Sequence, residues 1–483
     1  MSAAPYQAAS QGRRTRAWNA SGAGPTSAAT NAGQTLRNRA RAQYRNDPYG
    51  RSAINKLVSN IIGTGIKPRS LAADKSFQAE VQALWQRWAP ESDPEGLLSV
   101  YGQQMQAVNA WLQGGEAFLR ARPRRPSDGL SVPLQWQVME PEMCPLDFHQ
   151  QHGANTIRHG IEFDPIGRRV AYWFYRRHPG EMYPGATDAG QYTRVSASEV
   201  IHLFDPVRPG QIRGTPQIAS VLLRMWEVDK YDDATLMRQQ IANLFAAFVR
   251  RRPPDEGEGP TNPVTGEEVS QSGDEPPEIA LEPAMVNELD PEDEDVTFAS
   301  PPSAGDNYAD FLWQQLLATS AGSEVPYEVL TGDYSRINDR VARVILHEFR
   351  RRVQQMQQHI VIHQMCRRQW SVWLRRAVLS GALDAPGFGD SPQAYDRVRW
   401  IPQAWPYIHP QQDVAAQRES KRAGWKTQAE IISETTGRDI DDVYAELEAE
   451  NKQADARGLV LDSDPRRTAN NGSRTKPPED TEE

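Results

Sequence analysis

The sequence predicts an α+β protein in which helices pack against mostly antiparallel strands. A long amphipathic helical pattern runs from Arg336 to Leu379 without a Gly or Pro. Short β-branched and aromatic runs separated by turn residues lie between Glu116 and Phe204. An acidic insertion, Pro253 to Gly305, separates two further helical patterns. A chain of 483 residues has room for roughly two or three hydrophobic cores.

Charge is segregated along this chain. The net charge is −9, whereas residues 253–305 contain 15 acidic residues and no Lys or Arg, so the remainder carries +6. This balance argues against a tight DNA binder, which is normally basic. Cys144 and Cys366 are too few for a disulfide framework, which favours a reducing compartment. The sequence shows no signal peptide and no apolar run of transmembrane length, so we expect a soluble protein that is not exported.

The N-terminal half should contain a flexible arm and one α+β domain. Residues 1–35 are rich in small and polar residues and are expected to be flexible, and residues 36–217 form the domain. Apolar spacing predicts helices at Leu36 to Ile62, Phe77 to Trp88 and Leu97 to Gln113. The expected strands are Glu116 to Ala121, Leu134 to Met139, Gly160 to Phe163, Arg169 to Tyr175 and Glu199 to Phe204.

Two helices are expected on either side of the acidic insertion. The first helical pattern is Ile218 to Val249, within a region spanning 218–252, and the second region spans 306–321. Residues 253–277 have the composition of a disordered acidic loop. Glu278 to Ser300 could form a short strand or two, but its few apolar residues need packing from neighbouring chains.

A break follows at residues 322–335, where Gly322, Pro326 and Gly332 should stop helix propagation and leave a loop. Region 336–401 then holds the long helix, roughly 60–65 Å if unbroken, and a turn-rich return. Its polar face carries ten arginines against two acids. These arginines are either a solvated face or a surface that needs acidic partners, such as other subunits or DNA phosphates. Region 402–453 is again helical, and 454–483 is a polar, disordered tail.

Nothing in the sequence requires an enzyme, a cofactor or a metal. His359 and His363 lie one helical turn apart but lack the glutamate of a zincin motif, so packed or exposed histidines are the simpler interpretation. There is no phosphate-binding GxxxxGK[ST] loop and no GxSxG nucleophile motif.

Several stretches together resemble the lambda-type family of tailed-bacteriophage portal proteins, over about residues 36–450. The stretches are Asn60-Ile-Ile-Gly-Thr-Gly-Ile66, Gly115-Glu-Ala-Phe118, Gly160-Ile-Glu-Phe-Asp164 with Gly167-Arg168 and Ala171-Tyr172, Gly210-Gln-Ile-Arg-Gly-Thr-Pro216, Tyr231-Asp-Asp-Ala-Thr-Leu236, Val325-Pro-Tyr-Glu-Val-Leu-Thr-Gly-Asp-Tyr-Ser335, and Gly424 to Glu450 with Thr427, Gly437, Asp439 and Val443.

The resemblance implies a ring, commonly of twelve subunits, at one capsid vertex, through which double-stranded DNA is packaged and ejected. It implies a wing (36–217 and 336–401), two stem helices (218–252 and 306–321), a clip (253–305), a tunnel loop (322–335) and a helical crown (402–453). The implied partners are the terminase large subunit, the major capsid and scaffold proteins and a head-tail connector protein, with no membrane. The implied location is the virion, and the host cytoplasm during assembly.

Two sets of residues are candidates for function under this resemblance. The DNA-channel candidates in the tunnel loop are Glu324, Tyr327, Glu328, Asp333, Tyr334 and Arg336. The candidates for docking of terminase or connector in the clip are Glu278, Glu282, Glu288, Glu292 and Asp293. Tyr327 and Tyr334 could equally pack against the wing. The alternative from another class is a ring-shaped DNA-processing hydrolase or nuclease.

Overall fold

The computed structural model describes residues 15–181, 191–244, 248–251, 294–297, 308–405 and 409–459, with a few single positions outside these ranges. The described part of the chain divides into two compact units, one formed by residues up to 225 and from 318 onward and the other by residues 226–317. Within the described residues, no helix combines the length and the apolar character that a membrane span requires.

The first unit contains most of the helices and three of the sheets. Its helices are α1 (Pro25–Thr30), α2 (Gly33–Asn46), α3 (Pro48–Ile61), α4 (Lys75–Trp88), α5 (Val100–Gly114), α8 (Tyr327–Thr331), α9 (Asp339–Gln355), η6 (Met356–Cys366), α10 (Arg367–Leu379), α11 (Pro392–Tyr395), α12 (Pro410–Arg422), α13 (Gln428–Thr436) and α14 (Ile440–Ala456). Helices α6 (Leu222–Leu244) and α7 (Tyr308–Ser323) begin or end in this unit and continue into the other.

Every described strand pair is antiparallel, where the sequence predicts mostly antiparallel strands. One sheet has the order β3-β2-β9, from Leu134–Met139, Glu116–Pro123 and Val200–Phe204. A second has the order β4-β5-β6-β7-β8, from Gln150–His152, Asn155–Arg158, Ile161–Phe163, Arg169–Tyr175 and Tyr192–Ser196. A third pairs β1 (Lys67–Ser70) with β12 (Val398–Ile401), which lie far apart in the sequence.

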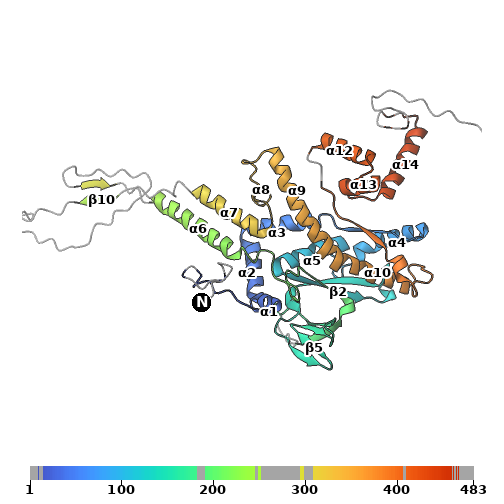
Figure 1. Cartoon of the computed structure of the whole chain (residues 1–483), viewed down its shortest axis with the longest axis horizontal. Helices are drawn as coiled ribbons and strands as arrows, with labels where there is room; N and C mark the ends of the chain where they lie inside the picture. Colours follow the sequence, from blue (N-terminus) through green and yellow to red (C-terminus); the bar gives the residue numbers. More distant parts are fainter. Residues whose placement is uncertain are drawn as a thin grey trace, which may run out of the picture. The chain divides into compact units, whose positions relative to one another are not determined.

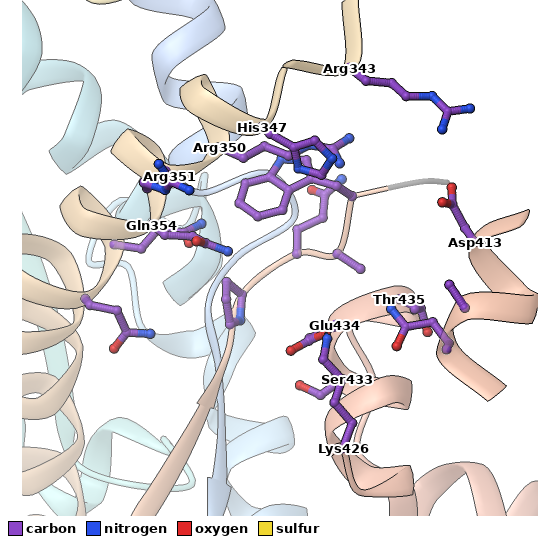
Figure 2. Close-up of a pocket in the computed structure, with 18 residues that line it drawn as sticks. Arg343, His347, Arg350, Arg351, Gln354, Asp413, Lys426, Ser433, Glu434 and Thr435 are labelled. Carbon is purple, nitrogen blue, oxygen red and sulfur yellow. The ribbon is translucent and has the colours of Figure 1, made fainter. Parts of the chain in front are cut away.

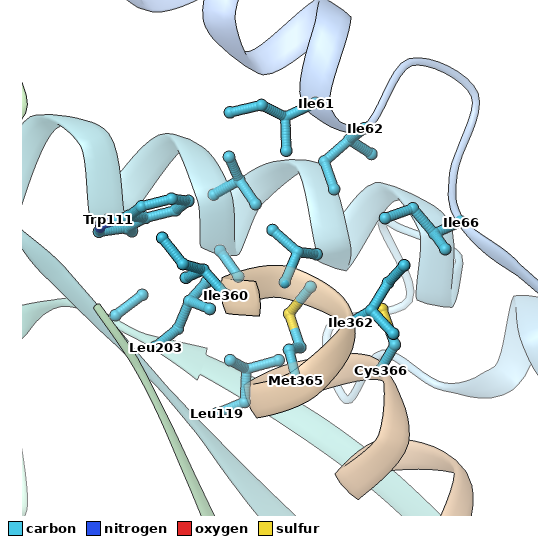
Figure 3. Packing of buried hydrophobic residues seen from close by; sticks show 14 of the residues in the cluster. Ile61, Ile62, Ile66, Trp111, Leu119, Leu203, Ile360, Ile362, Met365 and Cys366 are labelled. Atoms are coloured by element: carbon cyan, nitrogen blue, oxygen red, sulfur yellow. The ribbon is translucent and has the colours of Figure 1, made fainter. Parts of the chain in front are cut away.

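The main core lies between helices α3 and α5, the long helix and the sheet that contains β2 (Figure 1). Figure 3 shows Ile360, Met365 and Cys366 of the long helix between α3 and the strand residues Leu119 and Leu203. Because this part of the helix is enclosed on two sides, seven of its eleven residues are buried, more than one helical stripe would provide.

The long helix exists as predicted, with two differences. It starts at Asp339 rather than Arg336, because the Asn338 side chain caps the helix by accepting from the backbone N–H of Val341 at 3.0 Å. Its middle segment, η6, has π-helical hydrogen bonding and links α9 to α10. Gln357 in η6 donates to the carbonyl of Ile61 at 2.8 Å and so satisfies the C-terminal end of α3.

Three predictions near the ends of the chain are wrong in part. The arm is not flexible up to residue 35, because α1 and the start of α2 lie at 25–35, with Ala29 buried. The helix predicted from Leu36 to Ile62 is two helices, because Pro48 begins a new helix that Asp47 caps. The expected disordered tail from 454 begins too early, since α14 continues to Ala456.

The second unit contains the greater part of α6, the antiparallel pair β10 (Phe248–Arg251) and β11 (Glu294–Thr297), and the first part of α7. The prediction of a helix to Val249 is wrong, because Phe248 and Val249 belong to β10. The Tyr231 ring packs 4.7 Å from Phe311 and 6.0 Å from Tyr308. The Tyr308 hydroxyl donates to Asp232 at 2.7 Å. These contacts join α6 to α7 on either side of the acidic insertion.

Candidate functional site

The segment between α7 and α9 is more ordered than the predicted loop. Helix α7 continues through Gly322 to Ser323, so Gly322 does not stop it. The helix ends instead at Glu324, whose φ of 63° lies in the left-handed region that non-glycine residues seldom adopt. A short helix, α8, then occupies much of the stretch predicted to be a loop.

The Glu324 side chain is held by hydrogen bonds to two residues outside this segment. Its carboxylate accepts from Arg352 Nε at 2.8 Å and from Gln217 Nε2 at 3.0 Å. The Arg352 guanidinium also lies 3.6 Å from Asp205 Oδ2. Burial raises the pKa of Asp205, and Arg352 opposes that shift. The arginine therefore offsets the negative charge that the sequence assigned to the channel at Glu324.

Helix α8 packs against α3. Val325 and Leu330 are buried, and the Ser52 hydroxyl donates to the Leu330 carbonyl at 2.7 Å. The half-buried Tyr327 donates to Asp333 at 3.3 Å, and burial together with this carboxylate raises the pKa of Tyr327. The half-buried Glu328 lies in the first turn of the same helix.

The C-terminal end of this segment faces solvent. Tyr334 is 56% exposed, and Ser335 and Arg336 are exposed as well. Asp333 accepts from the backbone N–H of Ser335 at 3.0 Å, and hydrogen bonds from Ser335 lower the pKa of this carboxyl group. The structure thus brings Tyr327 and Asp333 together, and it places Tyr334 and Arg336 at the surface.

A basic cleft of about 870 Å³ lies between the long helix and the C-terminal helices (Figure 2). Arg343, His347, Arg350 and Arg351 line one wall from α9. The other wall comes from α12, α13 and the residues just before α13, with Asp413, Lys426, Ser433, Glu434 and Thr435.

Two contacts fix the edges of this basic cleft. Arg350 lies 5.3 Å from the centre of the Trp405 ring, a cation–π contact, and burial lowers the pKa of Arg350. His409 Nε2 lies 2.8 Å from Asp339 Oδ2, which joins the start of α12 to the start of α9. The sequence offered no signal for this cleft, because its walls lie about 60–90 residues apart.

The first unit also contains a buried ionic network, which no local pattern in the sequence predicted. Glu116 is fully buried and accepts from Arg213 Nε at 2.8 Å, from His202 Nε2 at 2.9 Å and from Arg37. Burial alone would raise the pKa of Glu116, but the guanidinium groups of Arg213 and Arg37 outweigh it and hold that pKa well below its usual value.

This network explains why two of the quoted sequence stretches occur together. The backbone N–H of Gly214 donates to Glu116 at 3.0 Å. A side chain at Gly214 would overlap the Gly115 carbonyl, and Gly115 itself has a φ of 89° directly against the backbone of Thr215. The stretches 115–118 and 210–216 are therefore two halves of one close backbone contact that only glycine permits.

The docking candidates and the two histidines of the long helix are the remaining residues singled out in the sequence. The docking candidates Glu278, Glu282, Glu288, Glu292 and Asp293 lie outside the described residues. His359 and His363 are both exposed on the long helix.

Among the described residues, one group could in principle hold a metal ion: Glu140, Glu142 and His178. However, Arg41 bridges both carboxylates, at 3.3 Å from Glu140 and 2.8 Å from Glu142, and already supplies the positive charge that a metal would bring.

Comparisons with known proteins agree on one family. The profile described as "Phage portal protein, lambda family" matches residues 11–357. The probable portal protein of Halomonas phage phiHAP-1 is 24% identical and aligns with 88% of this chain and 82% of its own length. Portal protein B of Escherichia phage lambda is 22% identical, over 93% of this chain and 89% of its own.

Among solved structures, a chain from the neck of an empty gene transfer agent (GTA) particle computed with C6 symmetry is similar, with a TM-score of 0.44 and 13% identity. The alignment covers 82% of this chain and 91% of that one.

The family match decides between the two alternatives drawn from the sequence. It covers well over half of the chain, and portal proteins are structural components of the virion rather than enzymes. The hydrolase alternative is therefore set aside, and the expectation of a non-enzymatic virion protein is confirmed by the family. This chain belongs to the lambda family of phage portal proteins.

Proposed function

We propose that the protein assembles into a closed ring at one capsid vertex and that double-stranded DNA enters and leaves through this ring. The observation that carries the proposal, beside the family, is the α6–α7 pair. In a single chain it exposes Trp226, Leu236 and Met237, by 48%, 58% and 63%. Packing between neighbouring α6–α7 pairs would bury these side chains, and a heterologous contact repeated around an axis closes a ring.

Native mass spectrometry tests this assembly. The expected result is a single large species whose mass is a whole multiple of the 54.2 kDa chain, with twelve copies as the count that the family suggests. Monomers or dimers at every concentration and salt level would contradict the proposal.

The acidic insertion, residues 253–305, is the proposed docking surface for the terminase large subunit and the connector protein. Its charge of −15 suits basic partners, and β11 within it pairs with β10 just before it. The chain has no phosphate-binding loop, so a separate motor would hydrolyse ATP.

Deleting Asp255 to Gly273 is expected to leave ring formation and the midpoint of thermal unfolding nearly unchanged while weakening terminase binding. The reason is that this stretch has few apolar residues with which to stabilise a core. Native mass spectrometry, a thermal melt and a terminase pull-down measure the three effects. Loss of the ring would show that the insertion is a structural element.

The segment 322–335, with Arg336, is the proposed contact with passing DNA. Because Glu324 is bound to Arg352, the exposed Tyr334 is the better position to test. Tyr334→Lys should leave ring assembly intact and slow DNA packaging at low salt, since a new phosphate contact resists sliding and is screened by salt.

The matched control is Tyr334→Gln, which removes the aromatic group without adding charge. A packaging assay with the cognate motor compares the three proteins at two salt concentrations. If Tyr334→Lys packages at the wild-type rate at low salt, this segment does not lie on the DNA path.

A further inference from the structure

The three C-terminal helices form almost no core of their own. Helices α12 and α14 contain no buried residue, and α13 buries only Ile432. Large apolar side chains remain exposed instead, including Trp425 at 81%, Tyr444 at 51% and Leu447 at 46%. Burial of apolar side chains is the main stabilising contribution to folding, so these helices lack their main source of stability in a single chain.

Helix α14 carries two of these exposed apolar side chains, Tyr444 and Leu447, together with a negative charge. Tyr444 and Leu447 lie three residues apart and so share one helix face. Residues 440–456 contain six acids and one lysine, a net charge of −5. The start of the helix is tied to its own chain by Arg69, which lies 3.5 Å from Asp439 and 3.0 Å from Asp442. From Tyr444 to Glu450 every residue is exposed.

The first part of α9 has the complementary character. From Asp339 to Glu348 the helix has no buried residue, and Val341 and Val344 are 43% and 66% exposed. Arg340 and Arg351 lie on the same side as Val344, at intervals of four and seven residues. An exposed apolar pair flanked by arginines thus matches an exposed apolar pair flanked by glutamates.

We propose that α14 of one chain packs against the first half of α9 of the neighbouring chain. In this contact Tyr444 and Leu447 cover Val341 and Val344, and the acids of α14 face the arginines of α9. The proposal rests on the ring proposed above, and it adds the surfaces through which neighbours in that ring meet.

The arrangement within one chain favours a second copy as the occupant. The basic cleft beside α9 is lined by residues of α12, α13 and the connecting segments and by none of α14 (Figure 2). The start of α14 is bound instead to Arg69 on β1 and lies 3.9 Å from Arg399 on β12. Each chain therefore offers one acidic and one basic surface at separate places, as a heterologous ring contact requires.

Disulfide cross-linking tests the contact directly. Chains with Val341→Cys or Val344→Cys are assembled together with chains carrying Tyr444→Cys or Leu447→Cys, in all four pairings. Each chain then has one accessible thiol, because Cys144 and Cys366 are buried and burial raises the pKa of both, that of Cys144 to about 11. A disulfide needs Cα atoms within roughly 7 Å, so its formation reports close packing.

The expected result is a covalent dimer from at least one of the four pairings, after mild oxidation of assembled rings. A chain carrying both cysteines of that pairing should form a ladder of multimers. The matched control is Ala449→Cys, exposed on the other side of α14, which should give at least about tenfold less product.

A charge test supplements the cross-linking. Glu448→Lys with Glu450→Lys should raise the concentration needed for half-assembly by about tenfold at low salt. Adding Arg340→Glu with Arg351→Glu should restore most of the assembly.

The outcomes separate this proposal from the ring itself. Rings that form but give no dimer in any pairing, or only cross-links within one chain, would overturn the α9–α14 contact and leave the ring standing. If the unsubstituted protein forms no rings, the proposed function fails first and this contact with it.

Discussion

Replacing Glu116 with Gln is expected to lower the free energy of unfolding by about 3–5 kcal/mol, the usual cost of leaving a buried charge without its partner. The substitution keeps the shape of the side chain but removes its charge, so the buried guanidinium groups of Arg37 and Arg213 face each other uncompensated. The two arginines come from α2 and from the stretch 210–216, so the loss loosens the contact between these segments and β2.

Urea denaturation followed by tryptophan fluorescence measures this change. Glu348→Gln is the matched control, because Glu348 forms an exposed ion pair with Arg351 at 3.2 Å and such pairs contribute about 0–1 kcal/mol. Equal effects of the two substitutions would show that Glu116 contributes no more than a surface charge.

The same network makes stability depend on pH. Burial lowers the pKa of His202 to about 4, although Glu116 accepts a hydrogen bond from it. An unfolded histidine titrates near 6.5, so below that pH the unfolded chain binds the proton and the folded chain does not. The contribution of His202 is therefore present above pH 6.5 and is lost as the pH falls toward 4. Glu116, whose folded pKa is depressed, loses its contribution at still lower pH.

Trp373→Ala is expected to lower the free energy of unfolding by a similar amount, about 3–5 kcal/mol. Trp373 on α10 is fully buried, and its ring lies 4.9 Å from that of Trp85 and 5.9 Å from that of Trp88. Both of these belong to α4, so the substitution leaves a large cavity between α4 and the end of the long helix.

Trp425→Ala serves as the control for this prediction. Trp425 is 81% exposed in a single chain, so its loss should change monomer stability by about 0.5 kcal/mol or less. Comparable losses in the two variants would mean that the aromatic cluster on α4 and α10 does not hold these helices together.

The sequence was most informative where one local pattern decides the structure. Strands Leu134–Met139 and Arg169–Tyr175 have the bounds that alternation and turn residues predict. The long helix was identified by its apolar spacing over more than ten turns. The sequence also contains a signal for the break at Pro48, because Asp followed by Pro is typical of a helix start. The helical apolar spacing continues on both sides of it, however, so a single helix was predicted.

The missed features depend on partners that are distant in the sequence. Strands β1 and β12 pair across more than 300 residues, and Phe248–Arg251 becomes a strand because it pairs with β11, about 40 residues further along the chain and inside the acidic insertion. The role of Glu116 requires Arg37, His202 and Arg213, which no local pattern links. Glu324 looked like an unpaired acid in the sequence for the same reason, because its partner Arg352 lies on α9, 28 residues further along the chain.

An end-on electron-microscopy image of the assembled protein would show whether the chain forms a conduit for DNA. We expect closed rings of uniform subunit number, with a central hole wide enough for a DNA duplex and the α6–α7 pairs packed side by side around it. Open filaments, or compact particles without a central hole, would contradict the proposed role as a DNA conduit.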